Sequence, residues 1–89
     1  MALNLSTKVL KTMIDERLST EYKQVVIKSQ PFYSNSDGLC FHVIDLGSFE
    51  PALVIEYAGT WEDGDLFYPE DYDTIDEMYA EMIAEIEQA

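Results

Sequence analysis

The feature that most constrains the fold is an apolar stripe near the end of the chain. Six apolar residues recur there at spacings of three and four, which places them on one face of an α-helix: Ile75, Met78, Tyr79, Met82, Ile83 and Ile86. Asp73, with Asp76 three residues later, predicts the N-cap of this helix. A helix with one continuous apolar face needs a surface to pack against, and the rest of the chain has to supply it.

A second amphipathic pattern predicts another helix near the start of the chain. Its apolar positions follow the same spacing: Leu5, Val9, Leu10, Met13, Ile14 and Leu18. Asn4 or Ser6 can cap this helix, and Ser19-Thr20 ends it. The two helices are therefore separated by a segment of more than fifty residues in which a sheet can form.

Between the helices, β-branched and aromatic residues predict three strands: residues 22–28, 39–46 and 52–57. Short connections between successive strands favour an antiparallel meander. A fourth strand over 66–68 would form if Asp63-Gly64 closes a hairpin with 60–61; otherwise this stretch is a loop. We expect an α+β fold in the order α-β-β-β-(β)-α, in which an N-terminal and a C-terminal helix flank the sheet.

Length and composition indicate one domain, residues 1–89, without a membrane span. No apolar run reaches the ~18 residues that a spanning helix needs. The single cysteine, Cys40, cannot form an intramolecular disulfide, and residues 1–10 lack the pattern of a signal peptide. We therefore expect a soluble protein in the cytoplasm.

Charge is strongly segregated along the sequence. All five bases lie within the first 28 residues, whereas residues 29–89 contain 15 acids and no base, and the net charge is −13. This charge excludes direct binding to DNA, RNA or an anionic membrane. The acids either form an ordinary solvated surface or produce an electrostatic field that attracts a basic partner. The complete absence of bases over 61 residues favours the partner.

The acids of the last helix break a local rule of helix stability. Glu77, Glu81 and Glu85 follow one another at intervals of four, where like charges repel. Glu85 and Glu87 also lie near the helix C-terminus, where the helix dipole disfavours negative charge. One reading is that these carboxylates lie on the solvated face of a helix that core packing stabilises. The other is that they are kept for binding a partner, because residues that break local rules are often functional.

The segment before this helix combines carboxylates with aromatic residues, a mixture suited to binding the Arg and Lys of a basic groove. The predicted partner-binding residues here are Trp61, Glu62, Asp63, Asp65, Tyr68, Glu70, Asp71, Tyr72 and Asp73. The aromatics could instead cover the open end of the sheet. A calcium loop starting at Asp71 fails because Ile75, Asp76 and Met82 occupy its fifth, sixth and twelfth positions, so we predict no metal site. Weak, adventitious cation binding stays open.

The sequence offers little for catalysis. Cys40 and His42 lie two apart on a predicted strand and so share a face, but this spacing alone does not align a nucleophile with its base. We expect a buried thiol beside a hydrogen-bonded histidine. No glycine motif for phosphate is present. We predict that the protein is not an enzyme and uses no cofactor.

In size, acidity and element order the chain resembles the small anti-defence inhibitors of phages, the anti-CRISPR and anti-restriction proteins that act as DNA mimics. No motif matches residue by residue, so no functional residue is carried over. The resemblance implies a non-enzymatic inhibitor whose acidic surface occupies the basic nucleic-acid groove of a host defence nuclease. The alternatives are an immunity protein or antitoxin against a basic toxin site, and an accessory protein whose acidity is unrelated to binding. We expect a monomer or homodimer.

Overall fold

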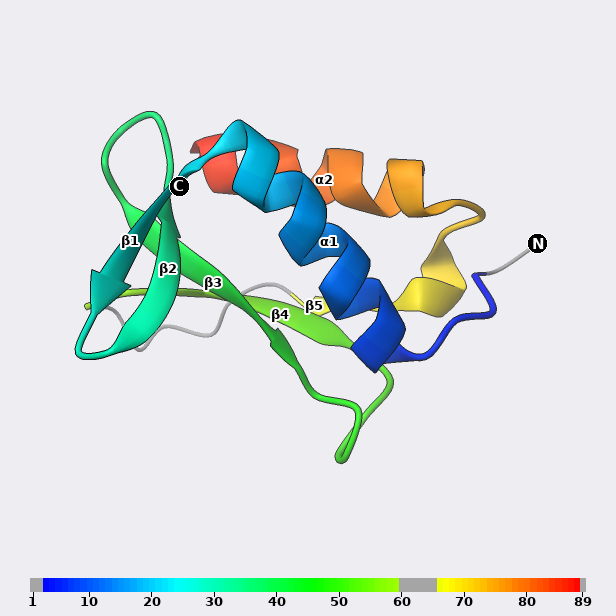
Figure 1. Ribbon diagram of the computed structural model, residues 1–89. Helices are drawn as coiled ribbons and strands as arrows, with labels where there is room; N and C mark the ends of the chain where they lie inside the picture. The colour runs from blue at the N-terminus through cyan, green and yellow to red at the C-terminus, as the bar shows by residue number, and fades with distance from the viewer. Residues whose placement is uncertain (1–2, 60–65, 89) are drawn as a thin grey trace.

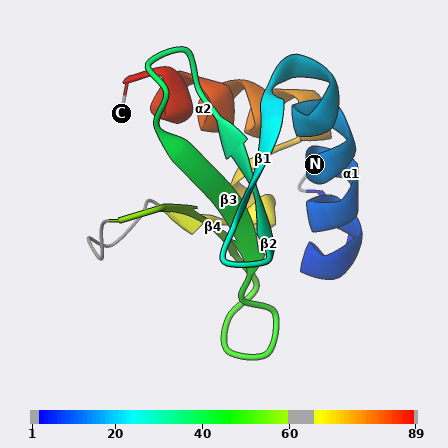
Figure 2. The ribbon, with the colours of Figure 1, turned by 60° about the vertical axis from the view of Figure 1, so that its left-hand side comes forward.

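Both helices lie on the same face of one antiparallel sheet, whose five strands follow in chain order from β1 to β5 (Figures 1 and 2). The computed structural model describes residues 3–59 and 66–88. Its elements are α1 (Thr7–Glu21), β1 (Lys23–Ile27), β2 (Gln30–Ser34), β3 (Cys40–Asp45), β4 (Leu53–Tyr57), β5 (Leu66–Phe67), the 3-10 turn η1 (Pro69–Asp71) and α2 (Ile75–Gln88). The expected α+β fold, with a helix at each end of an antiparallel meander, is confirmed.

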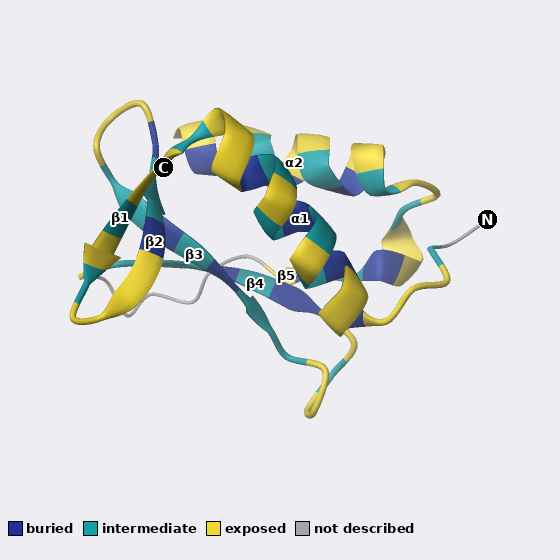
Figure 3. Cartoon of the chain, viewed as in Figure 1, coloured by how far each residue is buried: buried dark blue, intermediate teal, exposed yellow. Residues whose placement is uncertain are grey.

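One core joins the two helices to the sheet. Buried residues alternate with half-buried ones along most of β3 and β4, and each helix contributes one buried residue per turn (Figure 3). The buried cluster consists of Leu10, Ile14 and Leu18 of α1, Phe41 and Val43 of β3, Leu53 and Ile55 of β4, Phe67 of β5, and Met78, Met82 and Ile86 of α2. Neither described helix has the length and apolar content that a membrane crossing requires.

The sheet has more strands than the sequence predicts, because β2 forms a hairpin with β1. Two residues turn this hairpin, Lys28 and Ser29, and both adopt the left-handed conformation, with φ of 50° and 67°. Such turns usually carry Asn or Gly, so the sequence gives no signal for the hairpin. Pro31 also argues against a strand at this place. The expected fourth strand is β5, which pairs with β4, whereas the proposed Asp63-Gly64 turn lies outside the described residues.

The helix caps are partly those expected. Ser6 caps α1 by accepting a hydrogen bond from Val9 N at 3.2 Å. The predicted cap of α2, Asp73, is wrong by one residue, because the helix begins at Ile75 and Thr74 is its N-cap. Thr74 Oγ1 accepts from Glu77 N at 3.2 Å, and the Glu77 carboxylate accepts from Asp73 N at 3.3 Å. A reciprocal pair of this kind satisfies two backbone donors at the start of a helix.

The far end of α2 is fastened to the turn between β2 and β3 by a buried asparagine. Asn35 is 5% exposed, and its Nδ2 donates to the carbonyl of Ile86 at 2.9 Å. Its Oδ1 accepts from the backbone N–H groups of Asp37 and Leu39, at 3.0 and 2.9 Å. One side chain thus shapes the turn and satisfies a carbonyl in the last turn of the helix.

Candidate protein-binding surface

Six of the predicted carboxylates lie on η1, on α2 and on the segment that connects them. We call this set the acidic face: Glu70, Asp71, Asp73, Glu77, Glu81 and Glu85. Five of them are exposed, and Glu85 is half-buried. Because α2 rises about 6 Å over four residues, its three glutamates form a regularly spaced row along one flank of the helix. The other predicted site residues of this segment, Trp61, Glu62, Asp63 and Asp65, lie outside the described residues.

Tyrosine hydroxyls hold two carboxylates in and beside the acidic face. The hydroxyl of Tyr72 donates to Glu81 Oε2. Burial, followed by this hydrogen bond, raises the pKa of Tyr72 well above its usual range. Tyr68 donates in the same way to Glu50 Oε2 at 2.8 Å, and that bond raises the pKa of Tyr68. A hydroxyl donor fixes the position of a carboxylate while leaving its negative charge uncompensated.

A groove runs between β5 and α2 beside this row. Its volume is about 380 Å³, and it is lined by Leu66, Phe67, Tyr72, Glu81, Ala84, Glu85 and Gln88. The lining thus combines apolar side chains with two carboxylates. This lining suits a Lys or Arg side chain, whose alkyl stem packs on apolar surface while its charged head reaches a carboxylate.

Two bases of α1, Lys11 and Arg17, pair with carboxylates outside the acidic face. Lys11 Nζ lies 2.5 Å from Asp15 Oδ2 on the same helix. Arg17 donates to Asp76 at 2.6 Å and lies over the ring of Tyr79, 5.4 Å from its centroid. Asp76 belongs to the flank of α2 that faces α1.

The structure changes how the row of glutamates is interpreted. Glu77 takes part in the cap of α2, and Glu81 accepts from Tyr72. Two of the three residues that break the charge-spacing rule therefore have an intramolecular task. Their spacing alone is weaker evidence for a partner than the sequence suggested, and the net charge of the face is the stronger evidence.

Cys40 and His42 have different hydrogen-bond partners. His42 Nδ1 accepts from the Gln30 amide at 3.1 Å, so its Nε2 carries the proton and donates to Glu56 Oε1 at 3.0 Å. The ring also stacks on Phe32, with centroids 4.5 Å apart. The histidine is hydrogen-bonded as expected, but the thiol is only half-buried, contrary to the prediction.

Within residues 3–59 and 66–88, no group of three or more His, Cys, Asp or Glu side chains is placed to hold a metal ion.

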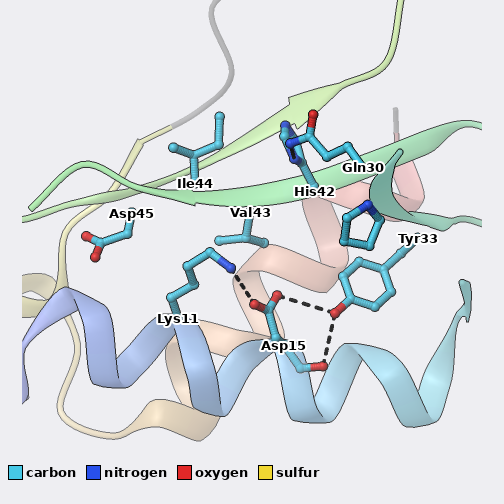
Figure 4. Close-up of a pocket in the computed structure, with 9 residues that line it drawn as sticks. Lys11, Asp15, Gln30, Tyr33, His42, Val43, Ile44 and Asp45 are labelled. Carbon is cyan, nitrogen blue, oxygen red and sulfur yellow. Dashed lines mark hydrogen bonds and ion pairs between the residues drawn. The ribbon is translucent and has the colours of Figure 1, made fainter. Parts of the chain in front are cut away.

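A second hollow, which the sequence analysis missed, opens between β2, β3 and α1 (Figure 4). Its volume is about 410 Å³. On the helix side, Lys11 pairs with Asp15, and Tyr33 Oη donates to the Asp15 backbone carbonyl at 3.3 Å. Burial and the neighbouring Asp15 carboxylate raise the pKa of Tyr33 to about 12. Without β2, nothing in the sequence pattern brings these residues together.

Comparison with known proteins adds no relative to this description. The chain matches no family model, no curated protein and no solved structure. Its function therefore has to be argued from the chemistry of its own surfaces.

Proposed function

We propose that the protein is a non-enzymatic inhibitor whose acidic face occupies the basic nucleic-acid-binding groove of a host defence nuclease. The observation that carries this proposal is the charge of the face. The six carboxylates of the acidic face lie in a part of the chain that contains no lysine or arginine. A surface of one sign, kept over two thirds of a chain, attracts a surface of the opposite sign.

The spacing of the carboxylates supports mimicry of a nucleic acid. Duplex DNA carries about one negative charge per 1.7 Å of its axis, and its binding proteins meet that charge with many Lys and Arg residues. Glu77, Glu81 and Glu85 repeat along α2 at about 6 Å, so they present a regularly spaced row of negative charges to such a groove. Binding of this kind is fast, and it weakens as the salt concentration rises.

Hydrogen bonds within the surface reduce the entropy that binding has to overcome. Tyr72 holds Glu81, and the cap holds Glu77, so these side chains lose less rotamer freedom when a base approaches. The groove beside Glu81 and Glu85 gives one basic side chain of the partner a place to insert. This insertion is the contact in which we expect the largest single contribution to affinity.

The test is a pair of charge reversals with a matched control. Glu81→Lys with Glu85→Lys changes two carboxylates of the face without touching the cap or the buried stripe. Glu16→Lys with Asp37→Lys changes the net charge equally at exposed positions outside the face. Partners are captured from host lysate, identified, and tested for release of labelled duplex DNA. The proposal requires a nucleic-acid enzyme that the wild type and the control displace from DNA, and that the Glu81/Glu85 variant does not.

Other outcomes of this experiment have definite meanings. Capture of a small cognate toxin, blocked by the same variant, would replace the proposal with an immunity protein or antitoxin. Equal inhibition by the Glu81/Glu85 variant and the control would show that the acidic face is not the binding surface. Inhibition that does not change with salt would contradict the electrostatic basis of the proposal.

A further inference from the structure

The two edges of the sheet differ in length. β5 forms one edge with only two residues, Leu66–Phe67. β1 forms the other edge with five residues, Lys23–Ile27, and among the described strands it pairs with β2 alone (Figure 1). Its residues are exposed or half-buried, and Val26 is 73% exposed. β1 is therefore the long open edge of the sheet, the kind of edge to which a further strand can add.

The hairpin between β1 and β2 fixes which backbone groups of β1 point outward. A two-residue turn joins the strands, so the adjacent pair, Ile27 with Gln30, is hydrogen-bonded, and bonded pairs alternate from there. Gln24 and Val26 occupy the intervening positions, and their N–H and C=O groups therefore point away from β2. Pro31 lies opposite Val26, where the ladder with β1 requires no N–H from it. The free edge thus presents an alternating row of donors and acceptors.

The charge around this edge favours a second copy of the chain as its occupant. Residues 22–36, which include the whole hairpin, contain two lysines and no acid, whereas the chain has 18 acids and a net charge of −13. Two copies of such a chain repel each other least where both surfaces lack acids. A basic partner, in contrast, finds no carboxylate on the hairpin to bind.

The outward groups of β1 also match those of its own copy. Antiparallel bonding requires an outward residue opposite an outward residue, and Gln24 of one copy opposite Val26 of the other meets this requirement. That register is centred on Val25, the middle residue of β1, so every residue of the strand is paired. It places Lys23 of each copy opposite Ile27 of the other, and no like charges face each other. β1 is therefore self-complementary at full overlap.

We propose that the protein forms a homodimer in which the β1 edges of two copies pair as antiparallel strands and join the two sheets into one. Each Gln24–Val26 pair exchanges both of its backbone hydrogen bonds across the interface. Because both copies use the same edge, the contact is isologous and closes at the dimer. The short β5 edge offers no comparable place for a third copy. No residue of β1 belongs to the acidic face, so both acidic faces stay free and this inference does not depend on the proposed function.

Sedimentation of the full-length protein over a range of concentrations gives the first test. The wild type should form a dimer, and the dimer fraction should increase with salt, because salt screens the repulsion between two chains of charge −13. Binding of a basic partner should change with salt in the opposite direction, so this proposal and the proposed function can fail separately. A protein that stays monomeric up to about 1 mM, or a dimer that dissociates as salt rises, would overturn the proposal.

Two variants at one position test the edge itself. Val26→Pro removes an outward N–H but no bond of the ladder with β2, and it should weaken dimerisation at least about tenfold. Val26→Thr keeps both the N–H and a β-branched side chain, and it should dimerise within about threefold of the wild type. Circular dichroism checks that both variants are folded. Equal dimerisation of Val26→Pro and the wild type would contradict the proposed interface.

A disulfide measures the register and does not depend on the proline variant. In a Cys40→Ser background, Val25→Cys places two thiols opposite each other at a non-hydrogen-bonded pair, where Cα atoms lie about 4.5 Å apart. Mild oxidation should therefore link this variant into a covalent dimer. Val26→Cys is the matched control, because the two copies of that residue are displaced along the strands beyond the reach of a disulfide. No cross-linking of Val25→Cys, or equal cross-linking of both variants, would show that the proposed pairing is wrong.

Discussion

The two helices pack on the same sheet face but balance their charges in different ways. α1 carries both signs, and Lys11 pairs with Asp15 one turn away on the same helix. α2 carries acids and no base. Asp76 pairs with Arg17 of α1, whereas hydroxyl groups bind two other carboxylates of α2: Glu81 accepts from Tyr72, and Glu87 accepts from Tyr22 at 3.0 Å. An ion pair neutralises charge, whereas a hydroxyl only positions it. α2 therefore keeps a fixed arrangement of negative charge that a basic partner can use, and α1 does not.

The largest effect should come from breaking the core that the two helices share. Ile14 of α1 and Met82 of α2 are both wholly buried in one cluster. Ile14→Ala and Met82→Ala should each lower the free energy of unfolding by about 2–5 kcal/mol, measured by urea denaturation. A far smaller loss for Met82→Ala would mean that α2 is an arm attached to the sheet and not part of the core.

Alkaline pH should release the tyrosine contacts of both helices. Burial raises the pKa of Tyr22 and of Tyr33 to about 12, from an ordinary value of 10.0, with the carboxylates of Glu87 and Asp15 adding to the shift. Because the folded pKa is the higher one, the associated stability is complete below pH 10 and is lost as the pH rises to about 12. Urea midpoints should therefore fall over this range, together with a rise in tyrosinate absorbance.

Phenylalanine variants are the control for this pH dependence. Tyr22→Phe with Tyr33→Phe removes both titrating hydroxyls but keeps the rings, including the edge-on packing of Tyr22 against Phe41. The variant should show a shallower loss of stability between pH 10 and 12 than the wild type. An unchanged slope would assign the alkaline loss to other groups.

A smaller effect is expected where α2 is fastened to the sheet. Asn35→Ala removes a donor to Ile86 O and an acceptor for two backbone N–H groups in a buried site. We expect a loss of about 1–3 kcal/mol in the free energy of unfolding, because a buried carbonyl loses its partner. Asp37→Ala, in the same turn with an exposed side chain, should stay within about 0.5 kcal/mol of the wild type. Equal losses for both variants would assign the effect to the turn and not to the helix contact.

Much of the fold was predictable because its signals are local. The apolar spacing that predicts α2 and the β-branched runs that predict β3 and β4 each depend on neighbouring residues. β2 was missed because its turn uses Lys28 and Ser29, whose left-handed conformations are set by the hairpin and not by their residue types. The predicted N-cap of α2 was wrong by one residue because Asp73 and Thr74 are both residue types that cap helices well. Only the residue at which the helix begins distinguishes them.

The candidate site was predictable in composition but not in its contacts. Acid count and spacing located the carboxylates of the acidic face. The bond from Tyr72 to Glu81 depends on how η1 leads into α2, which no periodicity encodes. The hollow between β2, β3 and α1 depends on β2, a strand that the sequence did not reveal. Predictions therefore failed where a contact required the register of an unrecognised element.

The smallest effects separate structure from partner binding at the start of α2. Thr74→Ala should cost about 1 kcal/mol of unfolding free energy, and Asp73→Ala should cost less, because Thr74 Oγ1 is the group that accepts from Glu77 N. The reverse order, measured by thermal or urea unfolding, would restore Asp73 as the cap.

Glu77→Gln is the more informative change, since an amide oxygen can still accept from Asp73 N while the negative charge is lost. We expect its stability to equal that of the wild type to within about 0.5 kcal/mol. Weaker and less salt-sensitive binding of the captured partner by this variant would then show that the charge of Glu77 serves binding and not the cap. Full retention of binding would remove Glu77 from the acidic face as a functional residue.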